Sequence, residues 1–92
     1  MAVVTLDTYL HKQLRNPAFK KEWDKLEVQS QVTRALIRAR LDRGISQRTL
    51  ARKARTTQAV ISRIESMSVS PTVGLLERIA NALNKKLEIR FI

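Results

Sequence analysis

The sequence has 92 residues, of which 18 are basic and 8 acidic, so its formal charge at neutral pH is +10. That length predicts one small domain, and the absence of cysteine excludes disulfides and thiolate metal sites. No apolar run approaches the roughly 20 residues that span a bilayer and no charged leader precedes the first apolar residues, so we expect a cytoplasmic protein without a membrane partner. The positive charge favours a polyanion as partner, because neutralised phosphates release counterions.

Residues 1–27 form an N-terminal arm with apolar side chains of its own. Its start, Val3 to Leu6, is consistent with either an edge strand or irregular structure. Asn16 is a good N-cap and Pro17 is favoured at the first helical position, so we expect a helix to begin there. Its candidate partner contacts are Leu10, Phe19, Trp23 and Leu26. Two interpretations remain open: these side chains fold back on the core, or they bind another protein.

The helix that follows the arm is expected from Val28 to Arg43, closed by a left-handed C-cap at Gly44. Its apolar stripe is out of phase with Phe19 and Trp23, which predicts a bend between residues 26 and 29 and a domain boundary there. The stripe consists of Val28, Val32, Ala35, Leu36 and Ala39.

Two short helices are predicted next, one starting after Ser46 and one after Thr57, because each residue is a good N-cap before an apolar run at helical spacing. The apolar faces are made of Leu50, Ala51 and Ala54 in the first helix and of Ile61 and Ile64 in the second. Two helices this short, joined by three or four residues, form a helix-turn-helix unit whose second helix fits the DNA major groove.

The outward face of the second helix carries side chains that suit base recognition. Gln58 pairs well with adenine and Arg63 with guanine, because amide and guanidinium groups bind these bases through two hydrogen bonds. Ala59 and Val60 fit a thymine methyl group, and Ser62 contacts either a base or nothing. Nearby basic residues are candidates for phosphate contacts, and they comprise Arg48, Arg52, Lys53 and Arg55.

A last helix is expected to open at Ser70-Pro71-Thr72. Its predicted buried stripe is Val73, Leu76, Ile79, Ala80 and Leu83. Leu75 lies off that stripe and is either ordinary surface or a partner contact. The tail, Leu87 to Ile92, alternates apolar and charged residues and predicts a β-strand. Because a lone strand is unstable in water, it should pair with a second copy, with Val3 to Leu6, or with a partner's sheet.

The middle of the chain resembles the phage-repressor family of Cro and C1, also called XRE. The resemblance covers about residues 28–84 and lies in Gly44-Ile45-Ser46-Gln47, Leu50-Ala51, Thr57-Gln58, Ile61-Ser62-Arg63-Ile64-Glu65, Ser70-Pro71-Thr72 and Leu76-Glu77-Arg78-Ile79-Ala80-Asn81-Ala82-Leu83. It implies an all-α, lambda-repressor-like bundle. It also implies that Gln47 and Thr57 contact phosphates and that Arg40 and Glu65 form a structural ion pair.

Two positions depart from the family. Arg55 stands where the family usually has a glycine in the turn, and Met67 stands where it has another after the recognition helix. We therefore expect a turn of different construction, because a residue other than glycine adopts the left-handed conformation at a cost of about 1 kcal/mol or more.

The whole chain resembles a HigA-type antitoxin in the order and lengths of its arm (residues 1–27), helix-turn-helix domain (28–84) and tail (85–92). The resemblance implies an antitoxin that binds a RelE/HigB-like, mRNA-cleaving toxin and represses its own operon. Basic residues outnumber acidic ones in the arm, so inhibition of a basic toxin would depend on apolar docking. The alternative is a stand-alone, phage-repressor-like regulator without a toxin.

Such repressors bind palindromic operators as symmetric homodimers, with recognition helices one helical turn apart, about 34 Å. An enzyme is not expected. The only histidine, His11, has no cysteine or paired carboxylates beside it, and with two glycines the chain has no glycine-rich phosphate loop. We expect no catalytic residue, metal or cofactor.

Overall fold

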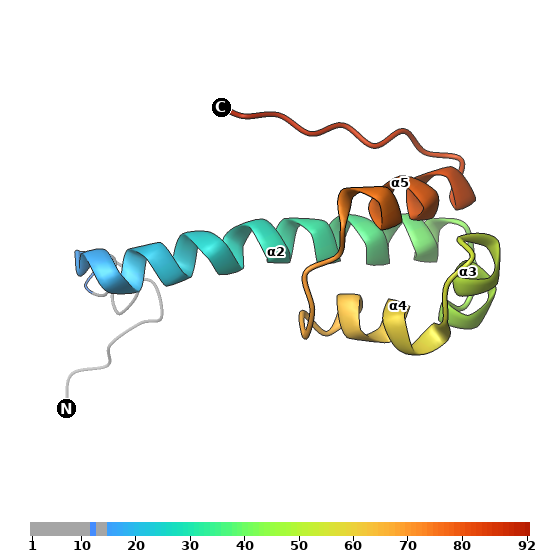
Figure 1. Ribbon diagram of the computed structural model, residues 1–92, viewed down its shortest axis with the longest axis horizontal. Helices are drawn as coiled ribbons and strands as arrows, with labels where there is room; N and C mark the ends of the chain where they lie inside the picture. The colour runs from blue at the N-terminus through green and yellow to red at the C-terminus, as the bar shows by residue number, and fades with distance from the viewer. Residues whose placement is uncertain (1–11, 13–14) are drawn as a thin grey trace.

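The computed structural model describes residue 12 and residues 15–92. Within residues 15–92 the only regular secondary structure is helical. The elements are α2 (Pro17–Asp42), α3 (Gln47–Lys53), α4 (Gln58–Glu65) and α5 (Val73–Ala82). α2 is the longest and runs through the molecule, with α5 on one side of it, α4 on the other, and α3 at its C-terminal end (Figure 1). The helices beside its C-terminal half form the bundle. No helix in this range is long and apolar enough to cross a membrane.

The predicted bend in the first helix is wrong, because α2 is one continuous helix of 26 residues. It passes residues 26–29 and the expected boundary at residue 28 without a break (Figure 1). The Asn16 side chain accepts a hydrogen bond from the Ala18 N–H at 3.0 Å, and Pro17 opens the helix as predicted. No proline or glycine lies between Ala18 and Asp42, so nothing in the backbone interrupts the helix. The apolar residues before and after residues 26–29 therefore lie on different sides of one straight helix, and no bend is needed to explain them.

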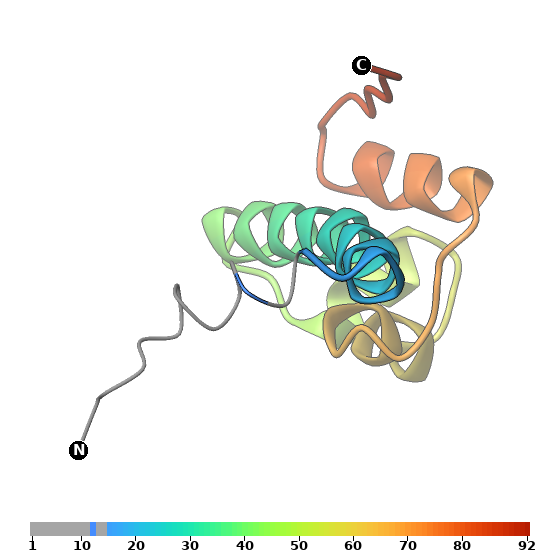
Figure 2. The same ribbon diagram turned by 90° about the vertical axis from the view of Figure 1, so that its left-hand side faces the viewer.

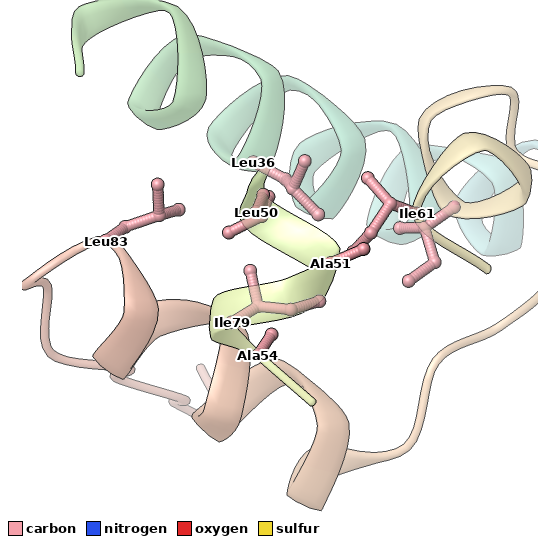
Figure 3. Packing of buried hydrophobic residues seen from close by; sticks show 8 residues of the cluster. Leu36, Leu50, Ala51, Ala54, Ile61, Ile79 and Leu83 are labelled. Atoms are coloured by element: carbon pink, nitrogen blue, oxygen red, sulfur yellow. The ribbon is translucent and has the colours of Figure 1, made fainter. Parts of the chain in front are cut away.

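The hydrophobic core lies where α3 meets α2, α4 and α5 (Figure 3). It contains Leu36, Leu50, Ala51, Ala54, Ile61, Ile64, Ile79 and Leu83. The predicted faces of α3 and α4 are confirmed, because every residue assigned to them is buried. This core holds the two short helices together, although each has fewer than ten residues and would be marginal alone.

The predicted stripes of the two outer helices need correction. On α2 the buried positions are Thr33 and Leu36, whereas Val28 is 62% exposed. On α5 Val73 is 59% exposed, and Leu75 packs against the core. Leu75 is therefore part of the packing around the core and not ordinary surface. Apolar spacing identified Leu36 on α2 and Ile79 and Leu83 on α5 correctly, but the buried side of each helix is not centred on the predicted stripe.

All four helices end in the same way, with a residue in the left-handed conformation. The φ angles are +65° at Gly44, +58° at Arg55, +60° at Met67 and +54° at Asn84. After α3, the Thr56 N–H donates to the Ala51 carbonyl at 2.9 Å and the Arg55 N–H to the Arg52 carbonyl at 3.2 Å, which is a Schellman motif. The turn is thus built with the left-handed geometry in spite of the missing glycine, and the expected difference in construction is not found.

The prediction of a β-strand in the tail is not supported. Residues 85–92 have no helix or strand assigned, and the part of the chain described here contains no strand at all. The tail leaves α5 and runs back beside α2 in an extended path (Figures 1 and 2). A strand exists only as part of a hydrogen-bonded ladder, and no extended segment lies beside the tail within residues 15–84.

Candidate nucleic-acid interface

α3 and α4 form the helix-turn-helix unit, and short-range interactions define where each helix begins. The Ser46 hydroxyl accepts from the Thr49 N–H at 3.0 Å, and the Thr57 hydroxyl accepts from the Val60 N–H at 3.2 Å. Ile61 and Ile64 are buried on the inner side of α4. The geometry of the unit follows from two local caps and one buried face.

The outer side of α4 is open to solvent. Its side chains Gln58, Ala59, Ser62 and Arg63 are all exposed. Ala59, Ser62 and Arg63 are each one or two residues from Ile61 or Ile64, so they occupy the side of the helix that faces away from the core, and Gln58 lies at the edge of that side in the first turn. This is the arrangement a major-groove helix needs, because base edges must be reached without disturbing the packing.

An ion pair joins the end of α4 to the end of α2. Arg40 donates from Nε to Glu65 Oε2 at 2.8 Å and from Nη2 to Glu65 Oε1 at 2.8 Å. Its Nη1 also donates to the carbonyl of Ile45 at 3.1 Å. The pair is mostly buried, with 14% of the Arg40 side chain and 8% of the Glu65 side chain exposed. The hydrogen bond to Glu65 raises the pKa of Arg40 above its ordinary value.

Gln47 belongs to the same network. Its Nε2 donates to Glu65 Oε1 at 3.2 Å, and the residue is half-buried at the start of α3. One carboxylate therefore connects α2, α3 and α4. The expected role of Gln47 as a phosphate contact is left to its amide oxygen and backbone, because its amide nitrogen is directed at Glu65.

Thr33 adds a contact that the sequence analysis missed. It is 8% exposed, and its hydroxyl donates to the carbonyl of Ile64 at 2.8 Å, within the last turn of α4. The signal was present in the spacing, because Thr33, Leu36 and Arg40 stand at i, i+3 and i+7 and share one side of α2. A search for apolar residues alone passes over a threonine and an arginine on that side.

Positive charge surrounds the exposed face. Between Gly44 and Ile64 the sequence has five basic residues and no acidic one. Four of the basic side chains, Arg48, Arg52, Lys53 and Arg55, belong to α3 or the turn, and all are exposed. The acidic residue nearest in sequence, Glu65, is neutralised by Arg40. The unit therefore presents a positive surface around the side chains of α4.

The candidate partner contacts lie at the other end of α2. The rings of Phe19 and Trp23 are stacked, with centroids 6.3 Å apart and planes 16° apart, and both side chains are half-buried. Leu26 is 49% exposed. Leu10 lies outside the described residues. Phe19, Trp23 and Leu26 belong to the N-terminal part of α2, which extends beyond the bundle (Figure 1), so these three residues do not fold back onto the core.

Comparison with known protein families gives one match. A family model described as Helix-turn-helix matches residues 36–89, which is more than half of the chain and includes α3, α4, α5 and the C-terminal turns of α2. No curated protein and no solved structure matches the chain.

Proposed function

The chain belongs to the helix-turn-helix family, and from that premise we propose that it is a transcriptional repressor that recognises a palindromic DNA operator with α4. The observation that carries the proposal is the exposed outer side of α4, which is held on its inner side by the core and by the Arg40–Glu65 pair. Such a helix enters the groove with its orientation already set, so little ordering is required on binding.

Within α4 the bases are read by Gln58 and Arg63. Gln58 is at the first position of the helix and points its amide at an adenine edge. Arg63 lies near the C-terminal end and pairs with guanine. Ala59 and Ser62 lie between them and contact the floor of the groove. The Thr57 backbone and the exposed arginines around α3 bind phosphates, which set the register but convey no sequence.

Two copies of the chain are needed for specificity. One helix of eight residues reads only a few base pairs, and a symmetric pair doubles the site. The two recognition helices then lie about 34 Å apart, in successive major grooves on one face of the duplex. The operator is accordingly an inverted repeat.

Selection from a random duplex library tests this function. The selected duplexes should contain an inverted repeat, and binding measured by fluorescence anisotropy should weaken steeply as salt rises. Arg63→Ala should cost roughly 1–3 kcal/mol and relax the preference at one position in each half-site. Arg15→Ala removes the same charge from an exposed position before α2, far from α4 in sequence, and is the matched control. Enrichment of no sequence, or equal weakening by both variants, would contradict recognition by α4.

A second role rests on the half-buried aromatic pair on α2. Phe19 and Trp23 stack on each other, apart from the bundle, in a segment that the core does not require. They support a protein partner, and the partner proposed is a RelE/HigB-like toxin, which would make the chain an antitoxin that represses its own operon. Residues 12–27 carry five basic and three acidic residues, so binding would be through the apolar surface.

Co-expression with the product of the adjacent reading frame tests the antitoxin role. The chain should relieve growth arrest caused by that product and co-purify with it. Trp23→Ala should abolish both effects and leave operator affinity unchanged, whereas the exposed Glu27→Ala, one turn further on, should change neither. A chain that represses its operon but never relieves growth arrest would be a stand-alone regulator.

A further inference from the structure

Arg78 of α5 contacts the turn between α3 and α4. Its Nε donates a hydrogen bond to the carbonyl of Ala54 at 3.2 Å, across 24 residues of sequence. Ala54 is the C-cap of α3, is 1% exposed, and lies in the core beside α5 (Figure 3). α5 is therefore tied to the turn by a hydrogen bond as well as to α3 by apolar packing.

The carbonyl of Ala54 requires a donor from outside α3. The last carbonyls of a helix have no N–H group in a following turn to bind, and here the chain turns away at Arg55, whose φ is +58°. The N–H groups that close the Schellman motif donate to other carbonyls. A carbonyl buried without a donor is costly, and a guanidinium suits this place because the C-terminal end of a helix is the negative end of its dipole.

The turn that Arg78 contacts leads directly to the end of α4 that carries Gln58. Thr57 caps α4, and its hydroxyl accepts from the Val60 N–H at 3.2 Å. Gln58 follows as the first residue of α4. Only three residues separate Gln58 from Ala54, so a displacement of the turn would move the Gln58 amide with it.

The other end of α4 is held independently of this contact. Arg40 binds Glu65, the last residue of α4, through two hydrogen bonds. That contact comes from α2, whereas the contact at the turn comes from α5. Loss of the α5 contact should therefore disturb the Gln58 end of α4 and leave the Arg63 end in place.

We propose that Arg78 is a positioning residue for base recognition: by donating to the Ala54 carbonyl it fixes the first turn of α4 and so sets the direction of the Gln58 amide. The inference rests on the proposed function and deepens it, because it assigns part of the sequence preference to a residue that acts through the turn. An amide binds adenine through two hydrogen bonds that must be aligned at once. A small rotation of the first turn removes that preference, whereas attraction to phosphates depends on charge and persists.

Two substitutions of similar shape separate the hydrogen bond from the charge. The Nε2 of glutamine is as many bonds from the backbone as the Nε of arginine, so Arg78→Gln keeps an N–H donor at that place. Arg78→Met puts a methyl group there instead. Both variants lose the positive charge, so a difference between them reports the hydrogen bond alone. Arg78 is exposed, and glutamine and methionine both favour helices, so both variants should fold, which circular dichroism checks.

Affinities for a set of operator duplexes, each with one base pair changed, measure the effect on DNA reading. Arg78→Met should lower the preference for adenine at the position read by Gln58 about tenfold and leave the preference for guanine at the position read by Arg63 unchanged. Arg78→Gln should keep both preferences. The ratio of two affinities does not depend on the folded fraction, so a loss of stability alone would not give this pattern. Arg34→Met removes an equal charge from an exposed position on α2 and should change neither preference.

Amide hydrogen exchange measures the same contact without DNA. The Val60 N–H, in the first turn of α4, should exchange about tenfold faster in Arg78→Met than in Arg78→Gln, because local opening of that turn becomes easier. The Ser68 N–H, which donates to the carbonyl of Arg63 at 2.8 Å, should exchange at the same rate in both variants. Arg78→Lys keeps the charge and places its N–H groups one bond further out, so the Val60 rate in that variant should be intermediate.

Equal behaviour of Arg78→Gln and Arg78→Met, in base preference and in exchange, would overturn the proposal. If both variants weaken binding to every duplex alike and reduce its salt dependence, Arg78 is a phosphate contact instead.

A failure of the proposed function looks different. A wild-type chain that selects no DNA sequence loses the repressor function, and exchange at Val60 then decides whether Arg78 holds the first turn of α4. A wild-type chain that selects an inverted repeat, which both variants read equally well, keeps the repressor function and loses this role of Arg78.

Discussion

The two halves of α2 differ in what holds them in place. The C-terminal half contains the buried Thr33 and Leu36 and the paired Arg40. The N-terminal half, residues 17–27, has no buried residue, although it is an uninterrupted continuation of the same helix. Its helical state depends on local signals, namely the Asn16 cap, Pro17 and the absence of a helix breaker. The comparison teaches that one helix can serve as scaffold at one end and as an exposed surface at the other.

The largest contrast between the halves should come from truncating a leucine in each region. Leu50 in the bundle is fully buried, so Leu50→Ala should lower the free energy of unfolding by about 2–5 kcal/mol. Leu26, on the exposed half of α2, is 49% exposed, and Leu26→Ala should change it by less than about 0.5 kcal/mol. Urea denaturation followed by circular dichroism measures both. Equal losses of unfolding free energy in Leu50→Ala and Leu26→Ala would show that the N-terminal half of α2 is packed as tightly as the bundle.

The second-largest loss of unfolding free energy should come from breaking the ion pair at the C-terminal end of α2. Arg40→Ala leaves the Glu65 carboxylate mostly buried without its partner, and it should cost on the order of 3 kcal/mol. Arg38, two residues earlier, is exposed, and Arg38→Ala should have almost no effect on unfolding. A loss at Arg40 no larger than that at Arg38 would mean that the network does not hold α4. Because Glu65 ends α4, operator affinity should fall together with stability.

A stabilising change should follow from the turn. Arg55 has φ of +58°, so Arg55→Gly should raise the free energy of unfolding by roughly 0.5–1 kcal/mol, the relief of strain being partly offset by the greater freedom of glycine in the unfolded chain. Lys53→Gly removes an equal charge two residues earlier, inside α3, and should destabilise by about 1 kcal/mol. The midpoint temperature of thermal unfolding should rise in Arg55→Gly and fall in Lys53→Gly. Shifts of the same sign would contradict backbone strain at Arg55.

The smallest effect on the bundle should come from breaking the exposed half of α2. Glu22→Pro should reduce the helical circular dichroism signal and change the unfolding free energy of the bundle by less than about 0.5 kcal/mol, because local opening there is not coupled to the core. Arg38→Pro, an exposed position on the other half, should cost about 3 kcal/mol or more. Cooperative unfolding of the bundle by Glu22→Pro would remove the distinction between the halves.

The helix-turn-helix site could be predicted from the sequence because its signals are local. Ser46 and Thr57 cap their helices as expected, and every apolar residue assigned to the inner faces of α3 and α4 is buried. The Arg40–Glu65 pair, expected from family resemblance, is present in the structure. The assignment of Gln58 and Arg63 to bases stays a prediction, because it concerns a partner that the chain alone does not contain.

Other features could not be predicted, because they depend on contacts between distant segments. The side of α2 that packs was misplaced, since Thr33 reaches Ile64 and Arg40 reaches Glu65 across 31 and 25 residues of sequence. Leu75 was expected to be either ordinary surface or a partner contact because it falls off the stripe of α5, whereas it packs against the core. The tail strand was predicted from alternation alone, and a strand also needs a neighbour.

The sequence by itself determined where most of the helices begin and end and which face of α4 is available to DNA, because caps and periodicity act within one or two turns. Only the tertiary structure decided that α2 continues past the expected bend, that one carboxylate joins three helices, and that Arg78 of α5 reaches the carbonyl of Ala54. The physical reason is that these features arise from the packing of segments far apart in the chain, where side-chain shape and hydrogen-bond geometry, rather than local preference, determine which residues meet.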